Sequence, residues 1–162
     1  MFGNGGGIGL DLFYKTYARK VRNTTIVGNW ASGAGGGVHS TNDTNRKVSL
    51  VDCIVAGNTS GTAAKTVDMS YTGGVGYCLF DVEADKTGAK SLFGSPAFVD
   101  AANNDYRLSA SSPAVGAGVT YEGIGTDLDG AAFANPPSIG CYEFDGTVSP
   151  PAKRSRIVFS ID

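Results

Sequence analysis

The sequence is poor in charge, and the charge that it has is not concentrated in a basic surface. Asp, Glu, Lys and Arg together make up 17% of the 162 residues, and the formal net charge is −2. No basic stripe of the kind that follows nucleic-acid phosphates runs through residues 1–150. The one local basic run, residues 153–156 (KRSR), is typical of a solvated tail. The composition therefore argues against a nucleic-acid partner.

Long hydrophobic runs and closely spaced metal-ligand pairs are missing as well. No apolar stretch is long enough to cross a bilayer, and Met1 leads into a Gly-rich segment without the features of a secretory signal. Cys53, Cys78 and Cys141 contain no C-x-x-C pair, so the sequence gives no support for a zinc or thioredoxin-type site. We expect three small buried residues, and one disulfide would be compatible with an exported protein.

Helical periodicity is also absent, whereas glycine is abundant. No long run places apolar residues at positions i, i+3, i+4 and i+7. The 24 glycines have no Gly-X-Y period, which excludes a collagen helix, and they indicate many tight turns. Low charge with 41% hydrophobic residues is typical of a packed chain rather than a disordered one. The sequence therefore predicts one domain of many short strands.

An internal repeat occupies the first half of the chain. Residues 21–29 (VRNTTIVGN) return 29 residues later as residues 50–58 (LVDCIVAGN), and residues 5–8 (GGGI) return 30 residues later as residues 35–38 (GGGV). Each repeat contains two or three short apolar alternations that are separated by Asn, Asp or Gly. The regular leucines of a leucine-rich repeat are missing, and WD40 and kelch repeats are longer. The period of 25–30 residues favours a parallel β-solenoid.

Stacked coils make a specific prediction about the core. Successive coils of a solenoid lie about 4.8 Å apart, so equivalent residues should stack in columns. The predicted interior columns are Ile8 with Val38 and Val67, Val21 with Leu50, Thr24 with Cys53, and Ile26 with Val55. We expect Asn4, Asn29 and Asn58 to form a hydrogen-bonded ladder in one turn, and Asp52 to share a second turn position with Asn23.

The repeat fades after residue 80, and three motifs follow. They are residues 96–118, which contain PAFVD, DYRLSA and SPAVGAG, then residues 126–130 (TDLDG), then residues 139–144 (IGCYEF). With the coils before them, these motifs resemble the C-terminal end of bacterial right-handed parallel β-helix repeat proteins of the pectate-lyase-like superfamily. The resemblance covers about residues 1–144. The chain departs from it at Cys141, where a small residue is more usual.

The resemblance implies an all-β, right-handed parallel β-helix on the exterior of a bacterial cell, either secreted or surface-anchored. It does not imply one activity, because the superfamily includes pectate and alginate lyases, polygalacturonases and adhesins. We divide the chain into coils over residues 1–80, terminal coils with a cap over residues 81–146, and a tail strand over residues 147–162. Since residue 1 leads almost directly into a coil, we expect a longer natural protein, or a homo-oligomer that buries the N-terminal coil edge.

Catalytic candidates are few. Asp127 and Asp129 form the best local acidic pair, and Glu143 lies in the terminal motif. Two carboxylates at a set separation are what glycoside hydrolysis requires. The same residue types also serve simply as turn and cap residues. The Asp-x-Asp-Gly pattern hints at Ca²⁺ but lacks the other ligands of an EF-hand loop, so we predict no resident metal or cofactor.

The remaining polar residues have simpler interpretations. His39, the sole histidine, follows an inward-facing valine and is expected on the outside of its strand, with no sign of a catalytic triad. Residues 81, 83 and 85 are acidic and alternate along a strand-like stretch, which is typical of a solvated face.

Exposed aromatic residues on a flat solenoid face could stack on sugar rings, and Trp30, Tyr71 and Tyr77 are the candidates.

Three functions remain open at this point. They are a non-catalytic module that binds a polysaccharide or cell-surface glycan, a polysaccharide lyase or glycoside hydrolase, and a structural fragment that self-associates through its N-terminal coil edge. Clustered carboxylates beside a basic residue would favour the enzyme, and an aromatic strip with few charges would favour the binder.

Overall fold

The computed structural model describes residues 6–10, 19–40, 48–62, 65–69 and 74–146. These residues are mostly strands and turns, with two single-turn 3-10 helices, which confirms the all-β prediction. The elements are β1 (Ile8–Leu10), β2 (Arg19–Arg22), β3 (Thr25–Val27), β4 (Trp30–Ala31), β5 (Val38–Ser40), β6 (Val48–Val51), β7 (Ile54–Ala56), β8 (Thr59–Ser60), β9 (Val67–Met69), β10 (Leu79–Phe80), η1 (Glu83–Asp85), β11 (Leu92–Phe93), β12 (Phe98–Asp100), η2 (Ala101–Asn103) and β13 (Asp105–Leu108).

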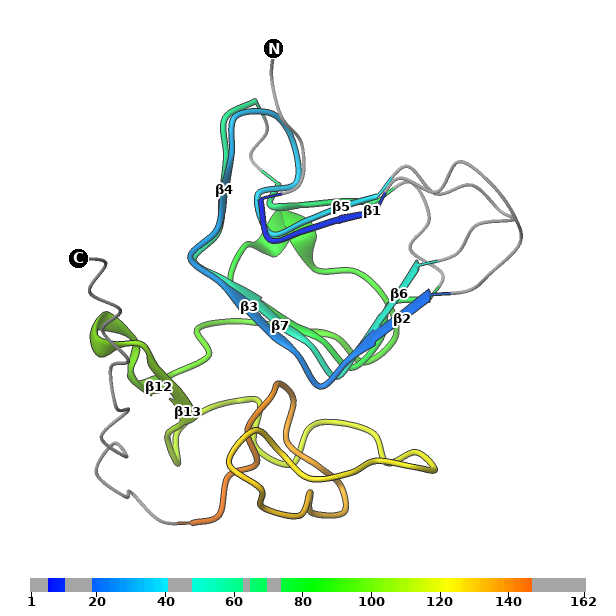
Figure 1. Cartoon of the computed structure of the whole chain (residues 1–162), viewed down its shortest axis with the longest axis vertical. Coiled ribbons are helices and arrows are strands. Elements are labelled where there is room, and N and C mark those ends of the chain that lie inside the picture. Colours follow the sequence, from blue (N-terminus) through cyan, green and yellow to red (C-terminus); the bar gives the residue numbers. More distant parts are fainter. Residues whose placement is uncertain (1–5, 11–18, 41–47, 63–64, 70–73, 147–162) are drawn as a thin grey trace, which may run out of the picture.

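Strands that lie one repeat apart pair in parallel. β2 pairs with β6, β3 with β7, β4 with β8, and β5 with both β1 and β9. In Figure 1 the strands of each pair lie almost over one another. The described strands form small sheets, of which the largest has the order β11-β10-β7-β3. Only β12 and β13, among the described strands, form an antiparallel pair.

The predicted apolar columns are confirmed by this register. Ile8 pairs with Val38 and Val38 with Val67, Val21 pairs with Leu50, and Ile26 pairs with Val55. Phe80 continues the last column above Val55, and Phe93 continues it above Phe80. The column is buried as far as Phe80, whereas Phe93 is 49% exposed because it is the last member. A period read from the sequence was sufficient to place these inner columns.

The asparagine ladder is also confirmed in the described coils. The Asn58 Oδ1 accepts hydrogen bonds from the backbone N–H of Asn29 at 3.0 Å and from its Nδ2 at 2.9 Å, while the Asn58 Nδ2 donates to the Ile26 carbonyl at 2.8 Å. Asn4 lies outside the described residues. The left-handed residues of this turn are Gly28 and Gly57, with φ of 69° and 62°, rather than the asparagines. Glycine adopts the left-handed backbone conformation without a steric cost, and Asn supplies the hydrogen bonds.

We expect Asn58→Ala to lower the free energy of unfolding by about 2 kcal/mol, because the buried Ile26 carbonyl and the Asn29 N–H would both lose a partner. Urea unfolding followed by circular dichroism measures this change. Thr59→Ala is the control, since Thr59 is the exposed neighbour in the next strand. An equal loss of stability in both variants would contradict the ladder's contribution.

A second turn forms the corner between the β2–β6 sheet and the β3–β7 sheet. Asn23, Asp52, Tyr77 and Lys90 occupy equivalent positions there, and all four have positive φ, between 41° and 57°. Asp52 therefore shares a turn position with Asn23, as the repeat predicts. After each of the first three comes Thr24, Cys53 or Cys78, whose side chain donates to the carbonyl two residues earlier.

The acidic residues 81, 83 and 85 were predicted to form a solvated face, and this prediction is wrong for Asp85, whereas Glu83 is exposed. Residues 83–85 form η1, and Asp85 is only 3% exposed. Its carboxylate accepts hydrogen bonds from the Thr66 N–H at 2.9 and 3.0 Å, the Thr66 hydroxyl at 2.6 Å and the Val67 N–H at 3.1 Å. These donors belong to β9 and the residue before it, and β9 is the last described strand of its sheet. Asp85 thus satisfies backbone groups that a further coil would otherwise bind.

His39 was predicted on the surface, and this prediction is also wrong. The residue is 8% exposed, and its Nδ1 lies 3.0 Å from the Asp68 Oδ2. Asp68 stands at the equivalent position of the next coil. Alternation does place His39 opposite the inward Val38, but the outer side of this strand is covered in the folded chain.

The lateral segment, residues 109–146, lies along the side of the coils rather than over their end. It packs against the outer face of the β11-β10-β7-β3 sheet, where Ile54, Leu79, Ala114 and Ile139 belong to one buried cluster. The Gly140 N–H also donates to the Asp52 carbonyl at 2.9 Å. This sheet is apolar on both faces, so its outer face needs a cover. The expected terminal cap is therefore a lateral cover in this structure.

Candidate functional site

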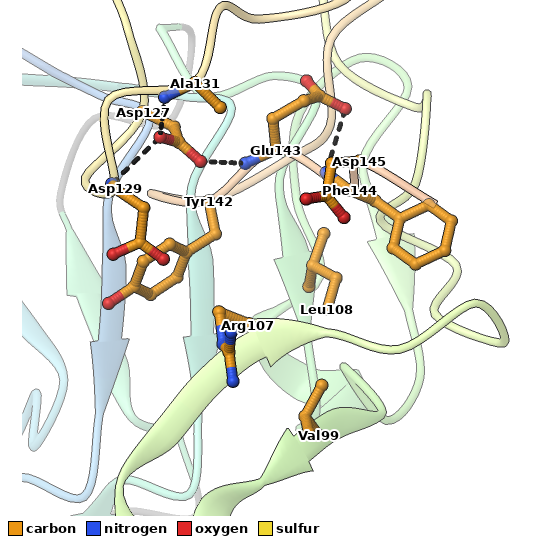
Figure 2. Close-up of a pocket in the computed structure, with 10 residues that line it drawn as sticks. All are labelled: Val99, Arg107, Leu108, Asp127, Asp129, Ala131, Tyr142, Glu143, Phe144 and Asp145. Atoms are coloured by element: carbon orange, nitrogen blue, oxygen red, sulfur yellow. Dashed lines mark hydrogen bonds between the residues drawn. The ribbon is translucent and has the colours of Figure 1, made fainter. Parts of the chain in front are cut away.

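One cavity of about 70 Å³ brings the three candidate carboxylates together (Figure 2). It lies between the β12–β13 hairpin and the lateral segment. Its lining consists of Val99, Arg107, Leu108, Asp127, Asp129, Ala131, Tyr142, Glu143, Phe144 and Asp145. The sequence singled out Asp127, Asp129 and Glu143, but it did not indicate that Arg107 would stand beside them.

Both oxygens of the Asp127 carboxylate are committed to the backbone. Oδ1 accepts from the N–H groups of Asp129 at 2.9 Å and Ala131 at 2.8 Å, and Oδ2 accepts from the Glu143 N–H at 3.0 Å. Figure 2 shows these bonds as dashed lines. Asp127 therefore shapes its own turn and ties it to residue 143, as a turn aspartate does.

Glu143 is committed in the same way. Its Oε2 accepts from the N–H groups of Ala134 at 3.2 Å and Ser138 at 2.9 Å. Its Oε1 accepts from the Ser138 hydroxyl at 2.5 Å and the Phe144 N–H at 3.1 Å. A carboxylate with every oxygen bound to the protein's own donors is poorly placed to exchange a proton with a substrate.

The cation of the cavity is paired as well. Arg107 binds Asp105 through two parallel bonds, from Nε to Oδ1 at 2.8 Å and from an Nη to Oδ2 at 2.6 Å. The hydrogen-bonded Asp105 carboxylate raises the pKa of Arg107, and the charge of Asp129 acts in the same direction. Arg107 therefore stays protonated and cannot serve as a base that accepts a proton.

What the cavity offers to a ligand is a combination of polar and apolar groups. Asp129 is exposed at its rim, and Tyr142, Val99 and Leu108 supply apolar surface. One edge of a sugar ring matches such a lining, because its hydroxyls can donate to a carboxylate while its C–H groups contact apolar atoms.

The predicted aromatic candidates do not form one strip. Trp30 lies in β4 beside Thr59 and is 65% exposed, so it is accessible for stacking. Tyr77 is partly buried in the corner turn, at the position equivalent to Asp52, which is a different corner of the coil. Tyr71 lies outside the described residues.

Neither a side-chain cluster suited to a metal ion nor a membrane-spanning helix occurs among the described residues. Among those residues no group of three or more His, Cys, Asp and Glu side chains could hold a metal ion. Across the same ranges, no helix has the length and hydropathy that spanning a membrane requires.

A second polar cluster, which the sequence did not reveal, lies where the corner turn meets the lateral segment. The Asp52 Oδ1 accepts from the Val119 N–H at 2.9 Å, and the Tyr121 hydroxyl donates to the Asn23 Oδ1 at 2.5 Å. The Arg22 guanidinium lies 4.0 Å from the centre of the Tyr121 ring. Burial raises the pKa of Asp52 to about 6, although the Val119 N–H and the Arg22 charge oppose this change. The cluster joins residues almost a hundred positions apart.

No protein-family model matches the chain, and no curated protein does.

Proposed function

We propose that this chain is the C-terminal part of a right-handed parallel β-helix, of the type found in exported or surface-anchored bacterial proteins of the pectate-lyase-like superfamily. The in-register parallel pairs one repeat apart support the proposal, and so do the continuous apolar columns and the asparagine ladder. The terminal motifs of residues 96–144 support the family and the extracellular or cell-surface location by resemblance.

The function that fits best is binding of a glycan without cleavage. The observation that carries this proposal is the state of the two inner carboxylates, Asp127 and Glu143, whose oxygens all accept hydrogen bonds from the chain itself. Glycosidases need two carboxyl groups that face the scissile bond. With those two engaged, Asp129 and Asp145 are the exposed carboxylates among the residues that line the cavity, and Asp129 is the one that the sequence singled out.

The experiment is affinity electrophoresis against a panel of acidic and neutral polysaccharides, with product detection on the same samples. We expect retardation without products. Asp129→Ala should weaken binding about tenfold, the loss of one charge-assisted hydrogen bond. Its structural hydrogen bond comes from the backbone N–H and is retained. Trp30→Ala tests the separate aromatic surface, and Glu122→Ala is the control because Glu122 is exposed and outside the cavity.

The outcomes of this experiment distinguish binding in the cavity from catalysis and from binding at β4. Cleavage products would contradict the non-catalytic proposal, and the absence of retardation on every polysaccharide would contradict glycan binding. Weaker binding of Trp30→Ala alone would move the site from the cavity to β4.

One observation favours the enzyme as the second candidate. The cavity does gather several carboxylates and one arginine, which is the composition expected of a polysaccharide lyase or glycoside hydrolase. In that case Asp129→Asn should abolish cleavage, while the control Glu122→Gln should retain it.

Self-association is the third candidate, and the half-exposed Phe93 at one end of the core column is the apolar surface that favours it. The N-terminal coil edge that we predicted as the interface falls partly outside the described residues. Light scattering across a concentration series tests self-association, since Phe93→Ser should abolish an oligomer that buries the Phe93 end of the column.

A further inference from the structure

Two of the three cysteines lie directly over one another in the core. The N–H of Leu79 donates to the Cys53 carbonyl at 2.9 Å, and Leu79 pairs in parallel with Ile54. Cys78 is therefore the equivalent of Cys53 in the next coil. Both side chains are fully buried and belong to the same apolar cluster. Adjacent strands bring such Cα atoms to about 4.8 Å, which is within the range that a disulfide spans.

The two sulfur atoms also interact with each other. A hydrogen bond between the thiols raises the pKa of Cys53 well above its ordinary value and lowers that of Cys78. Each thiol additionally contacts the carbonyl two residues before it, at 3.3 Å in both cases. No disulfide joins any two of the three cysteines in this structure.

The third cysteine lies on the other side of the sheet. The Cys141 N–H donates to the Thr25 hydroxyl, and Gly140 packs against Ile54, which belongs to the outer cluster. Cys53 faces the inner cluster instead. The β3–β7 sheet therefore separates Cys141 from the inner pair, which leaves Cys53 and Cys78 as the only partners that the fold brings together.

We propose that Cys53 and Cys78 form a disulfide that ties two successive coils when the chain folds in the presence of a thiol–disulfide oxidant. This inference goes beyond glycan binding and does not depend on it. The bond would close a loop within the core, between neighbouring coils of the described stack.

The reaction balances as two exchange steps. A thiolate of one cysteine attacks a small-molecule disulfide such as oxidised glutathione, and one glutathione leaves as a thiol. The second cysteine then attacks the mixed disulfide at the first sulfur and releases the other glutathione. The protein loses two electrons and two protons, which reduce the oxidant to two thiols. Because both sulfurs are buried in the folded chain, the exchange takes place before the coils close.

The test is refolding of the full chain from denaturant in a mixture of oxidised and reduced glutathione. Intact mass spectrometry should then show the loss of two hydrogens. Alkylation in denaturant should modify one thiol instead of three, and peptide mapping should place that thiol at Cys141. Reduction should be slow in native buffer and fast in denaturant, because the folded core shields the bond.

Two variants test which cysteines form the bond. Cys141→Ser should still lose two hydrogens and leave no thiol to alkylate, whereas Cys78→Ser should show no loss at all. Circular dichroism establishes that each variant folds. Three alkylated thiols in the oxidatively refolded protein would overturn the proposal, and so would a cross-linked peptide that contains Cys141.

Discussion

Replacing Asp85 with alanine is expected to lower the free energy of unfolding by about 3–5 kcal/mol, the largest effect of any single polar substitution that we predict. The carboxylate serves two backbone N–H groups and one hydroxyl of β9 and its preceding residue, and it is almost completely buried. Without it these donors would be desolvated and unpaired. Asp85→Asn should be nearly as harmful, because its amide would place a donor against donors.

Urea unfolding followed by circular dichroism measures the effect. Glu83→Ala is the matched control, since Glu83 belongs to the same single turn but is exposed. We expect the control to change the free energy of unfolding by less than about 0.5 kcal/mol. If Asp85→Ala resembled the control, Asp85 would not be what terminates the β1–β5–β9 sheet.

The second large effect is a pH dependence that arises from Asp52. Its carboxyl is fully buried, and its pKa in the folded protein is raised to about 6. Between about pH 4 and pH 6 the folded chain therefore binds more protons at this site than the unfolded chain. The contribution of the protonated Asp52 carboxyl to the free energy of unfolding is complete below about pH 4. It is lost as the pH rises through 6. It amounts to about 3 kcal/mol.

The readout is the difference in the free energy of unfolding between Asp52→Asn and the wild type at a series of pH values. Other carboxylates titrate in the same range, and they cancel in this difference. The variant should gain about 3 kcal/mol relative to the wild type between pH 4 and pH 7.5. The exposed Glu122→Gln serves as the control and should show a flat difference. A flat difference for Asp52→Asn as well would mean that Asp52 is hydrated at the junction rather than buried.

The repeat made part of the fold predictable. A column such as Ile26 with Val55 needs only the period and the alternation of a strand, because stacked coils bring equivalent positions together. The Asn29–Asn58 ladder follows from the same logic. Where the repeat fades, this logic fails, and Asp85 was interpreted as solvated because nothing local indicates that β9 needs acceptors.

In the candidate site, too, the sequence predicted some features and packing decided the others. The sequence indicated Asp127 and Glu143 as carboxylates in turn-rich motifs, and the structure brings them to one cavity. Their hydrogen-bond partners, such as the N–H groups of Ala131 and Ser138, decide what they can do. Backbone donors carry no residue signature, so no pattern of residue types could have shown that these carboxylates are already engaged.

The sequence by itself therefore determined the strand class, the parallel stacking and the interior columns, because these depend on spacing along one chain. Only the tertiary structure decided how residues 108–146 lie against the outer face of the β11-β10-β7-β3 sheet. It also decided that His39 is covered, that Cys53 is separated from Cys141 by a sheet, and that Asp52 is buried. Each of these results depends on which distant surface covers a side chain, and that is set by packing between segments rather than by the local pattern of either one.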